Sequence, residues 1–195
     1  MKKVMIALVL CIVSTICFAQ EKVGTYSCAY FDKEMDVEYS AKLKEYYIQI
    51  RGESNTTLAF FTIKTSKIDD FRKALSDTKA KYIEWTKVAK DNNVKEYDKD
   101  MDIKFPSGGG AWYGSKWWFT FYATPTPRFL ITDGKYLCLL FSGKKFTASS
   151  NEYINEKVYW VFSSPEEIDE LLALLTEEAL NKVKQEQQKT DDLFH

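Results

Sequence analysis

Two long segments of the chain carry apolar residues at steps of three, four and seven, a spacing that predicts two amphipathic helices. The first segment starts at Ser66, which suits an N-cap, and ends near Asn92. The second starts after Ser164 with Pro165 as its first helical residue, and it turns polar from Lys184 on. The predicted buried stripes are Ile68, Phe71, Leu75, Tyr82, Trp85 and Ala89, and then Ile168, Leu171, Leu172, Leu175, Ala179 and Val183.

Shorter segments rich in aromatic and β-branched residues precede each predicted helix and favour strands. The clearest local signal is Asp133-Gly134 between two such segments, because this pair suits the tight turn of a hairpin. Strands that come in runs before each helix argue against alternating β-α-β winding. We therefore expect an α+β fold with a mainly antiparallel sheet of seven to nine strands and two long amphipathic helices.

The two predicted helices begin alike, since Ile68-Asp69-Asp70-Phe71 and Ile168-Asp169-Glu170-Leu171 lie one hundred residues apart. This regularity suggests a duplicated strands-then-helix unit, with halves 20–93 and 94–187. The alternative is that any two amphipathic helices after strands resemble each other. Either way, residues 20–195 are expected to form one domain, because a chain of this length is typical of one.

The first nineteen residues have the pattern of a secretory signal peptide. Lys2 and Lys3 precede a short apolar run, and small residues up to Ala19 suit cleavage by a signal peptidase. We expect cleavage near Ala19, a secreted or periplasmic protein of bacterial type, and no membrane span once the signal is removed. A retained N-terminal anchor is the alternative.

The composition is that of an ordinary globular protein, with 45% apolar and 28% charged residues and a formal net charge of −1. A nearly neutral chain lacks the basic footprint of nucleic-acid binding. Two cysteines follow the predicted signal, Cys28 and Cys138. In an exported protein they could form a disulfide, or they could be two separate buried thiols in strands.

Catalytic motifs are scarce in the sequence. His195 is the only histidine and lies at the C-terminus, so a Ser-His-Asp or Cys-His set is not expected. Ser107-Gly108-Gly109-Gly110 lacks the Lys-Ser/Thr of a phosphate-binding loop and looks like a flexible break. We expect no metal and no cofactor. Carboxylates are plentiful, so a hydrolase with two acidic residues remains an alternative.

The most aromatic stretch of the chain places seven aromatic residues between Trp112 and Tyr122. In a strand, side chains alternate between two faces. We expect Phe119 and Phe121 to face the core and Trp118 and Tyr122 the other face, with Trp112 and Tyr113 beside them. The second face would be an exposed binding platform if both helices cover one side of the sheet, and would be covered if they cover both.

These observations favour an exported, non-enzymatic binding or interaction module with Trp112, Tyr113, Trp118 and Tyr122 as its candidate site. Flat rings next to hydroxyls can hold a glycan, a peptide or an envelope protein. The alternative is a carboxylate-based hydrolase acting on envelope or extracellular glycans. A structural protein that forms a homodimer through an open sheet face is a third interpretation.

Overall fold

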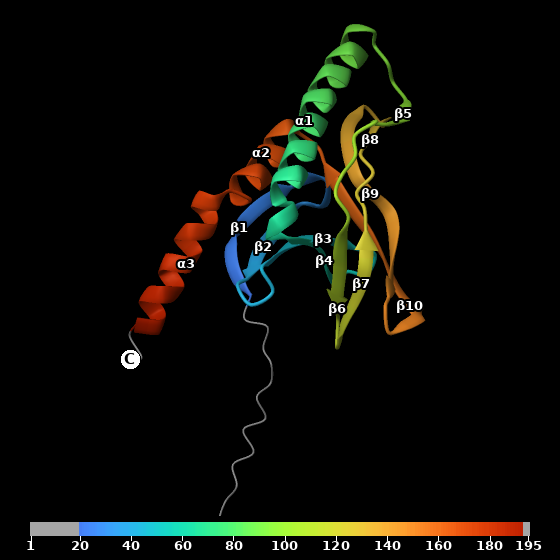
Figure 1. The fold of residues 1–195 in the computed structure, drawn as a ribbon. Helices are drawn as coiled ribbons and strands as arrows, with labels where there is room; N and C mark the ends of the chain where they lie inside the picture. Colours follow the sequence, from blue (N-terminus) through green and yellow to red (C-terminus); the bar gives the residue numbers. More distant parts are fainter. Residues whose placement is uncertain (1–19, 193–195) are drawn as a thin grey trace, which may run out of the picture.

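The computed structural model describes residues 20–192, so the predicted signal peptide and its cleavage near Ala19 lie outside the described residues (Figure 1). Four strands precede the first helix, α1 (Ile68–Asp91): β1 (Glu21–Cys28), β2 (Lys33–Ser40), β3 (Glu45–Gly52) and β4 (Leu58–Lys64). Six strands precede the remaining helices, α2 (Pro165–Leu174) and α3 (Glu177–Asp192). They are β5 (Tyr97–Asp100), β6 (Gly108–Tyr113), β7 (Trp117–Ala123), β8 (Arg128–Thr132), β9 (Lys135–Ala148) and β10 (Asn151–Phe162). Two short 3-10 helices, η1 (Ala29–Phe31) and η2 (Thr65–Lys67), follow β1 and β4.

The ten strands of the described residues belong to one antiparallel sheet. Eight of them follow the order β5-β8-β9-β10-β3-β4-β6-β7, while β2 pairs with β3 beside this path and β1 pairs with β2. Strand β3 shares one of its edges between two partners, since β2 pairs with its first half and β10 with its last two residues. The sheet curls so far that β7 approaches the end of β9, where the Ser149 N–H donates to the Phe119 carbonyl at 2.7 Å. The sequence-based prediction of an α+β fold is thus confirmed, with ten strands in place of seven to nine.

Two of the strands include segments whose sequence does not favour a strand. Tyr97–Asp100 is polar but pairs with β8 as an edge strand, and the glycine run forms the beginning of β6. The strands-then-helix order occurs twice, with four strands in the first run and six in the second. Whether the halves are duplicated stays a prediction.

The second predicted helix is not one long helix, because the chain breaks between α2 and α3. The Thr176 hydroxyl donates to the Ala173 carbonyl at 3.0 Å and accepts the Ala179 N–H at 3.2 Å. Thr176 therefore acts at the end of α2 and also as the N-cap of α3. The apolar stripe continues across the break, since Leu171, Leu175 and Leu180 are all buried.

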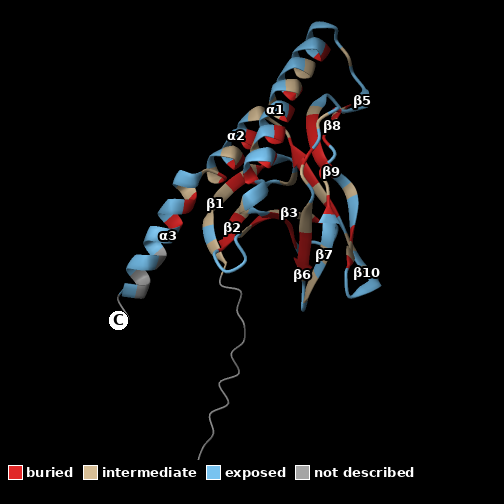
Figure 2. Cartoon of the chain, in the orientation of Figure 1, coloured by how far each residue is buried: buried red, intermediate tan, exposed pale blue. Residues whose placement is uncertain are grey.

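The three helices lie together on one side of the sheet, while β6, β7 and the tip of the β9–β10 hairpin lie away from them (Figure 1). Phe71 of α1 packs its ring 5.6 Å from that of Phe61 and 6.1 Å from that of Trp160. Buried positions follow the inner side of the strands and the sheet-facing stripe of the helices (Figure 2). Among the described helices, none combines the length and the apolar content needed to cross a bilayer.

The cysteines that could have formed a disulfide, Cys28 and Cys138, are both free and buried. The Cys28 thiol donates to the Val161 carbonyl at 3.3 Å. Cys138 lies on β9 between its ladder partners Phe129 and Phe162 and belongs to the same core. The structure thus corresponds to the alternative of two separate thiols, each packed as a small apolar side chain.

Candidate ligand-binding groove

A band of aromatic rings crosses four strands on the sheet face that is turned away from the main core. Tyr47 of β3 lies 6.3 Å from Phe60 of β4, measured between ring centroids, and Phe60 stacks 6.4 Å from Tyr113 of β6. Trp117 of β7 lies 4.3 Å from Tyr113 and stacks 5.8 Å from Phe119. We call these five residues the aromatic band.

The register of the strands explains why the band forms. Ala111 of β6 is the ladder partner of both Phe60 on β4 and Phe119 on β7, and Tyr113 is the partner of Trp117. Partners in neighbouring strands point to the same face of a sheet. The small Ala111 side chain leaves room for large rings on both sides. Tyr47, Phe60 and Ala111 are consequently buried in a small cluster of their own, separate from the main core.

A groove of about 610 Å³ lies beside this band. Its volume falls in the range of about 300–1,000 Å³ that is common for small-molecule sites. The lining residues come from the segment around β3, from β4 and η2, and from β6 and β7. They are Leu43, Glu45, Tyr47, Thr62, Lys64, Lys67, Ser107, Gly108, Gly109, Gly110, Phe119, Thr120, Phe121 and Tyr122.

Backbone rather than side chains forms the floor of the groove, because three consecutive glycines lie there. The β6–β7 register shifts between Gly108 and Gly110, which is a β-bulge. A β-carbon at Gly109 would lie 2.5 Å from the Thr62 Oγ1 and 3.3 Å from the Thr120 carbonyl oxygen. A side chain at position 109 would therefore collide with the wall of the groove, and glycine keeps this space open.

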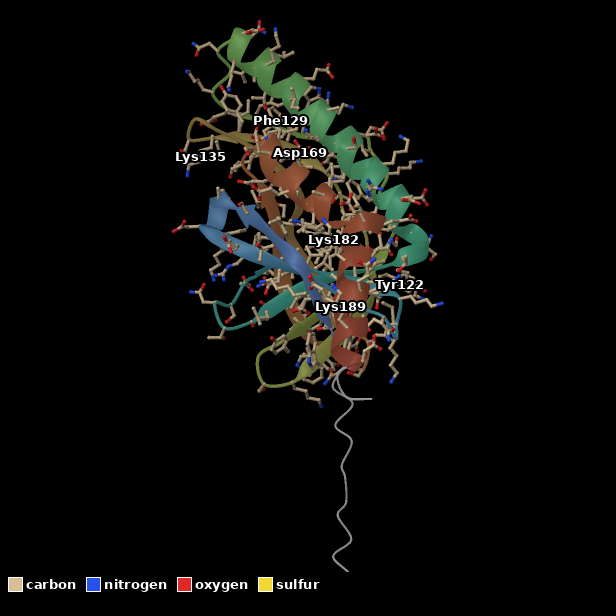
Figure 3. The ribbon with its side chains drawn as sticks, turned by 90° about the vertical axis from the view of Figure 1, so that its left-hand side faces the viewer. Tyr122, Phe129, Lys135, Asp169, Lys182 and Lys189 are labelled. Carbon is tan, nitrogen blue, oxygen red and sulfur yellow. The ribbon has the colours of Figure 1, made fainter. Side chains whose placement is uncertain are left out.

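The aromatic wall of the groove comes from β7. Phe119 is 39% exposed, Phe121 71% and Tyr122 83%, and Tyr122 lies at the edge of the molecule in Figure 3. The prediction that Phe119 and Phe121 face the core was wrong, because alternation fixes the period of a strand but not which face is inward. The larger Trp112 and Trp118 take the inner positions.

The four predicted site residues therefore have different environments. Trp112 is buried at 4% exposure, with its ring 6.4 Å from that of Phe146. Trp118 packs against the main core and carries the Lys116 ammonium 4.8 Å above its ring. Tyr113 belongs to the aromatic band, and Tyr122 lines the groove. Of the four predicted residues, Tyr113 thus lies in the aromatic band and Tyr122 in the groove lining. The two tryptophans lie on the side of the sheet that faces the main core.

The opposite wall of the groove, which was not predicted from the sequence, is polar and comes from the first half of the chain. Three of its residues carry charge: Glu45 at the start of β3, Lys64 at the end of β4 and Lys67 in η2. The available signal was the spacing of two polar residues, Thr62 and Lys64, at alternate positions of an otherwise apolar strand.

The polar groups of this wall interact through a hydrogen bond and through their charges. The Thr62 hydroxyl donates to the Glu45 carboxylate at 3.2 Å. Burial raises the pKa of Glu45 above its ordinary value, while the Thr62 hydrogen bond and the Lys64 charge act in the opposite direction. Burial, followed by the nearby Glu45 charge, raises the pKa of Tyr47 to about 12. The Tyr47 hydroxyl therefore keeps its proton at neutral pH.

Comparison with known proteins yields no match: no protein family, no curated protein and no solved structure is significantly similar to this chain.

Proposed function

We propose that the protein is an exported, non-enzymatic binding protein that holds a glycan in the groove between β7 and the β4–η2 segment. The observation that carries this proposal is the exposure of Phe121 and Tyr122, at 71% and 83%, beside a groove with a backbone floor. Large rings left in water next to a concave site are typical of a surface that becomes covered by a ligand.

A sugar ring suits this arrangement better than an extended peptide. Rings such as Phe121 and Tyr122 offer flat apolar surfaces, while Tyr47 and Thr62, which line the same groove, carry hydroxyl groups suited to sugar hydroxyls. The floor lies inside the sheet, where β6 is already paired on both edges with β4 and β7. A peptide could not extend the sheet here by adding a strand, which is a common mode of peptide recognition.

Binding to an immobilised glycan panel, followed by titration calorimetry with the best ligands, tests this proposal. We expect Phe121→Ala and Tyr122→Ala each to weaken binding about tenfold or more, as truncation of a central aromatic contact does. Tyr153→Ala is the matched control, because Tyr153 is 86% exposed and does not line the groove. Equal affinity of the wall variants and the control would contradict the proposal.

The hydrolase alternative requires two carboxylates facing one another across the site. Among the described residues that line the groove, Glu45 alone carries a carboxylate. This composition supports binding over hydrolysis. Incubating the bound glycan with the protein and following its chain length by mass spectrometry tests the point, and cleavage that is lost in Glu45→Gln would favour the hydrolase.

Export is the part of the proposal that rests on the first nineteen residues. Export is supported by the basic N-terminus, the apolar run that follows it and the small residues before Gln20. Expression of the whole chain in a bacterium, followed by cell fractionation and mass measurement, tests it directly. We expect a product beginning near Gln20 outside the cytoplasm. An intact product retaining Met1 in the cytoplasm would contradict export.

A further inference from the structure

We infer that the ligand of this groove is an acidic saccharide, with a carboxylate on its sugar rings that Lys64 and Lys67 neutralise. The inference rests on the proposed function and adds the charge of the ligand to it.

The first observation is the charge of the groove. Two of its fourteen lining residues are lysines and one is a glutamate, so the lining is formally +1 when Glu45 is ionised. The chain as a whole is formally −1. The groove is therefore a positive site on a slightly negative protein, and such complementarity selects anionic ligands. Because the lysines exceed the glutamate by one, a sugar ring that places one carboxylate in the groove matches the site best.

The second observation is that the two lysines are available to a ligand. Lys64 and Lys67 are both exposed, and neither takes part in an ion pair within 4.0 Å in the part of the chain that the structure describes. Lys64 acts on the Glu45 carboxyl only as a nearby charge that lowers its pKa. Ammonium groups without a fixed partner can turn toward a ligand carboxylate without breaking an existing contact.

The third observation is the order of the strands. The sheet runs β3-β4-β6-β7 in this region, so the glycine floor on β6 lies between the strand that ends at Lys64 and the strand that carries Phe119 and Phe121. A sugar that rests on the floor would have rings on one side and ammonium groups on the other. This arrangement fits a pyranose that bears a carboxylate on its edge.

Other anionic partners fit less well. Attraction to an anionic membrane typically uses clusters of four to eight basic residues, whereas the groove offers two lysines and an acid. Nucleic-acid binding leaves a broad basic surface that a chain of net charge −1 does not suggest. The charges of the groove therefore favour a saccharide carboxylate as the occupant.

Three acidic oligosaccharides, each compared with its own methyl ester, test the inference: trigalacturonate, a hyaluronan tetrasaccharide and an alginate trisaccharide. Esterification removes the charge and keeps the sugar chain. With the chain from Gln20 onward in low salt, we expect at least one acid to bind about tenfold more tightly than its ester. The Lys64→Gln/Lys67→Gln variant should remove this preference, so that it binds the acid and the ester with equal affinity.

The matched control is Lys33→Gln/Lys95→Gln, since both lysines are exposed and lie outside the groove lining. This control should bind as the unaltered protein does. If no acid binds more tightly than its ester, or if the control loses as much affinity as the groove variant, the inference is overturned. Recruitment to phosphatidylglycerol vesicles without binding of any acid would also overturn it, in favour of a lipid surface.

These outcomes separate the inference from the proposed function. If the unaltered protein binds esters as tightly as acids, and Tyr122→Ala weakens binding of the esters, the proposed glycan binding is supported and only the preference for charge is contradicted. Acids that bind equally to the unaltered protein, to Tyr122→Ala and to the lysine variant would contradict both.

Discussion

A β-carbon at Gly110 would lie 2.4 Å from the Cδ2 atom of Phe146, so the Phe146 ring occupies the space that any other residue at position 110 would need. Gly110 belongs to β6 and Phe146 to β9, which are not neighbours in the ladder. The Phe146 ring also lies 5.6 Å from Phe141 and 6.4 Å from Trp112. This contact fills the inside of the curled sheet directly beneath the groove floor.

We therefore expect Gly110→Ala to destabilise the protein by about 1–3 kcal/mol, as overpacking of a filled core does. Urea denaturation followed by tryptophan fluorescence measures this change. Gly114→Ala is the matched control, because its β-carbon would meet only the Thr56 carbonyl oxygen, at 4.0 Å. Equal stability of the two variants would show that the Phe146 ring moves aside at little cost.

Truncation of two aromatic residues from the same predicted site should change the free energy of unfolding by very different amounts. Trp112→Ala removes a side chain that is 4% exposed and is expected to cost about 3–5 kcal/mol of unfolding free energy. Tyr122→Ala removes one that is 83% exposed and should change stability by about 0.5 kcal/mol or less. Thermal denaturation of both variants checks the contrast. A large loss in Tyr122→Ala would mean that its ring supports the fold rather than a ligand.

The glycine run shows what sequence patterns can and cannot predict. Three glycines in a row look like a flexible break, since local sequence gives no sign of what approaches them. In the structure, β-carbons at Gly108 and Gly110 would overlap Phe61 and Phe146, whose positions depend on strands far away in the chain. The α+β class and the strand runs were predictable from local periodicity, but close approach between distant segments was not.

The aromatic stretch likewise shows that the sequence predicts a strand but not which of its faces is buried. Its strand character and its alternation were predicted, and Tyr113 and Tyr122 do line the band and groove. Which face points inward depends on the volume available beneath the sheet, and beneath β6 this volume is limited by Phe146 of the distant strand β9. The charged wall was missed for a related reason, because Lys64 and Lys67 join the site only through the pairing of β4 with β6.

Both thiols should be unreactive in the folded protein. Burial, followed by the charge of Glu167, raises the pKa of the Cys28 thiol to about 11, and burial alone raises the pKa of Cys138. Because the thiolate is the reactive form, iodoacetamide at pH 8 should label the chain from Gln20 onward very slowly. Mass spectrometry should show two labels after unfolding without reductant. A labelled mass that appears only after reduction would reveal a disulfide.

Affinity for an acidic saccharide should depend on pH through Glu45. Burial holds the pKa of this carboxyl above its ordinary value, so it gains a proton, as pH falls, before an ordinary carboxyl does. The formal charge of the groove lining then rises from +1 to +2, while a sugar carboxylate of lower pKa is still ionised. Affinity should increase about two- to fivefold as pH falls from 7 through the Glu45 pKa, the size expected for one added charge at solvent-exposed distances. It should fall again once the sugar itself is protonated.

The Glu45→Gln variant separates this charge effect from other causes of pH dependence. It removes the negative charge at every pH, so its affinity at pH 7 should already match the higher value that the unaltered protein reaches in acid, and the rise should be absent. Calorimetric titrations of both proteins between pH 7 and 4, with melting temperatures as a check on folding, give the comparison. Weaker binding by Glu45→Gln at pH 7 would instead mean that the carboxylate accepts hydrogen bonds from the sugar hydroxyls. In that case lowering the pH would weaken binding as Glu45 becomes protonated, because the neutral acid is a poorer acceptor than the carboxylate.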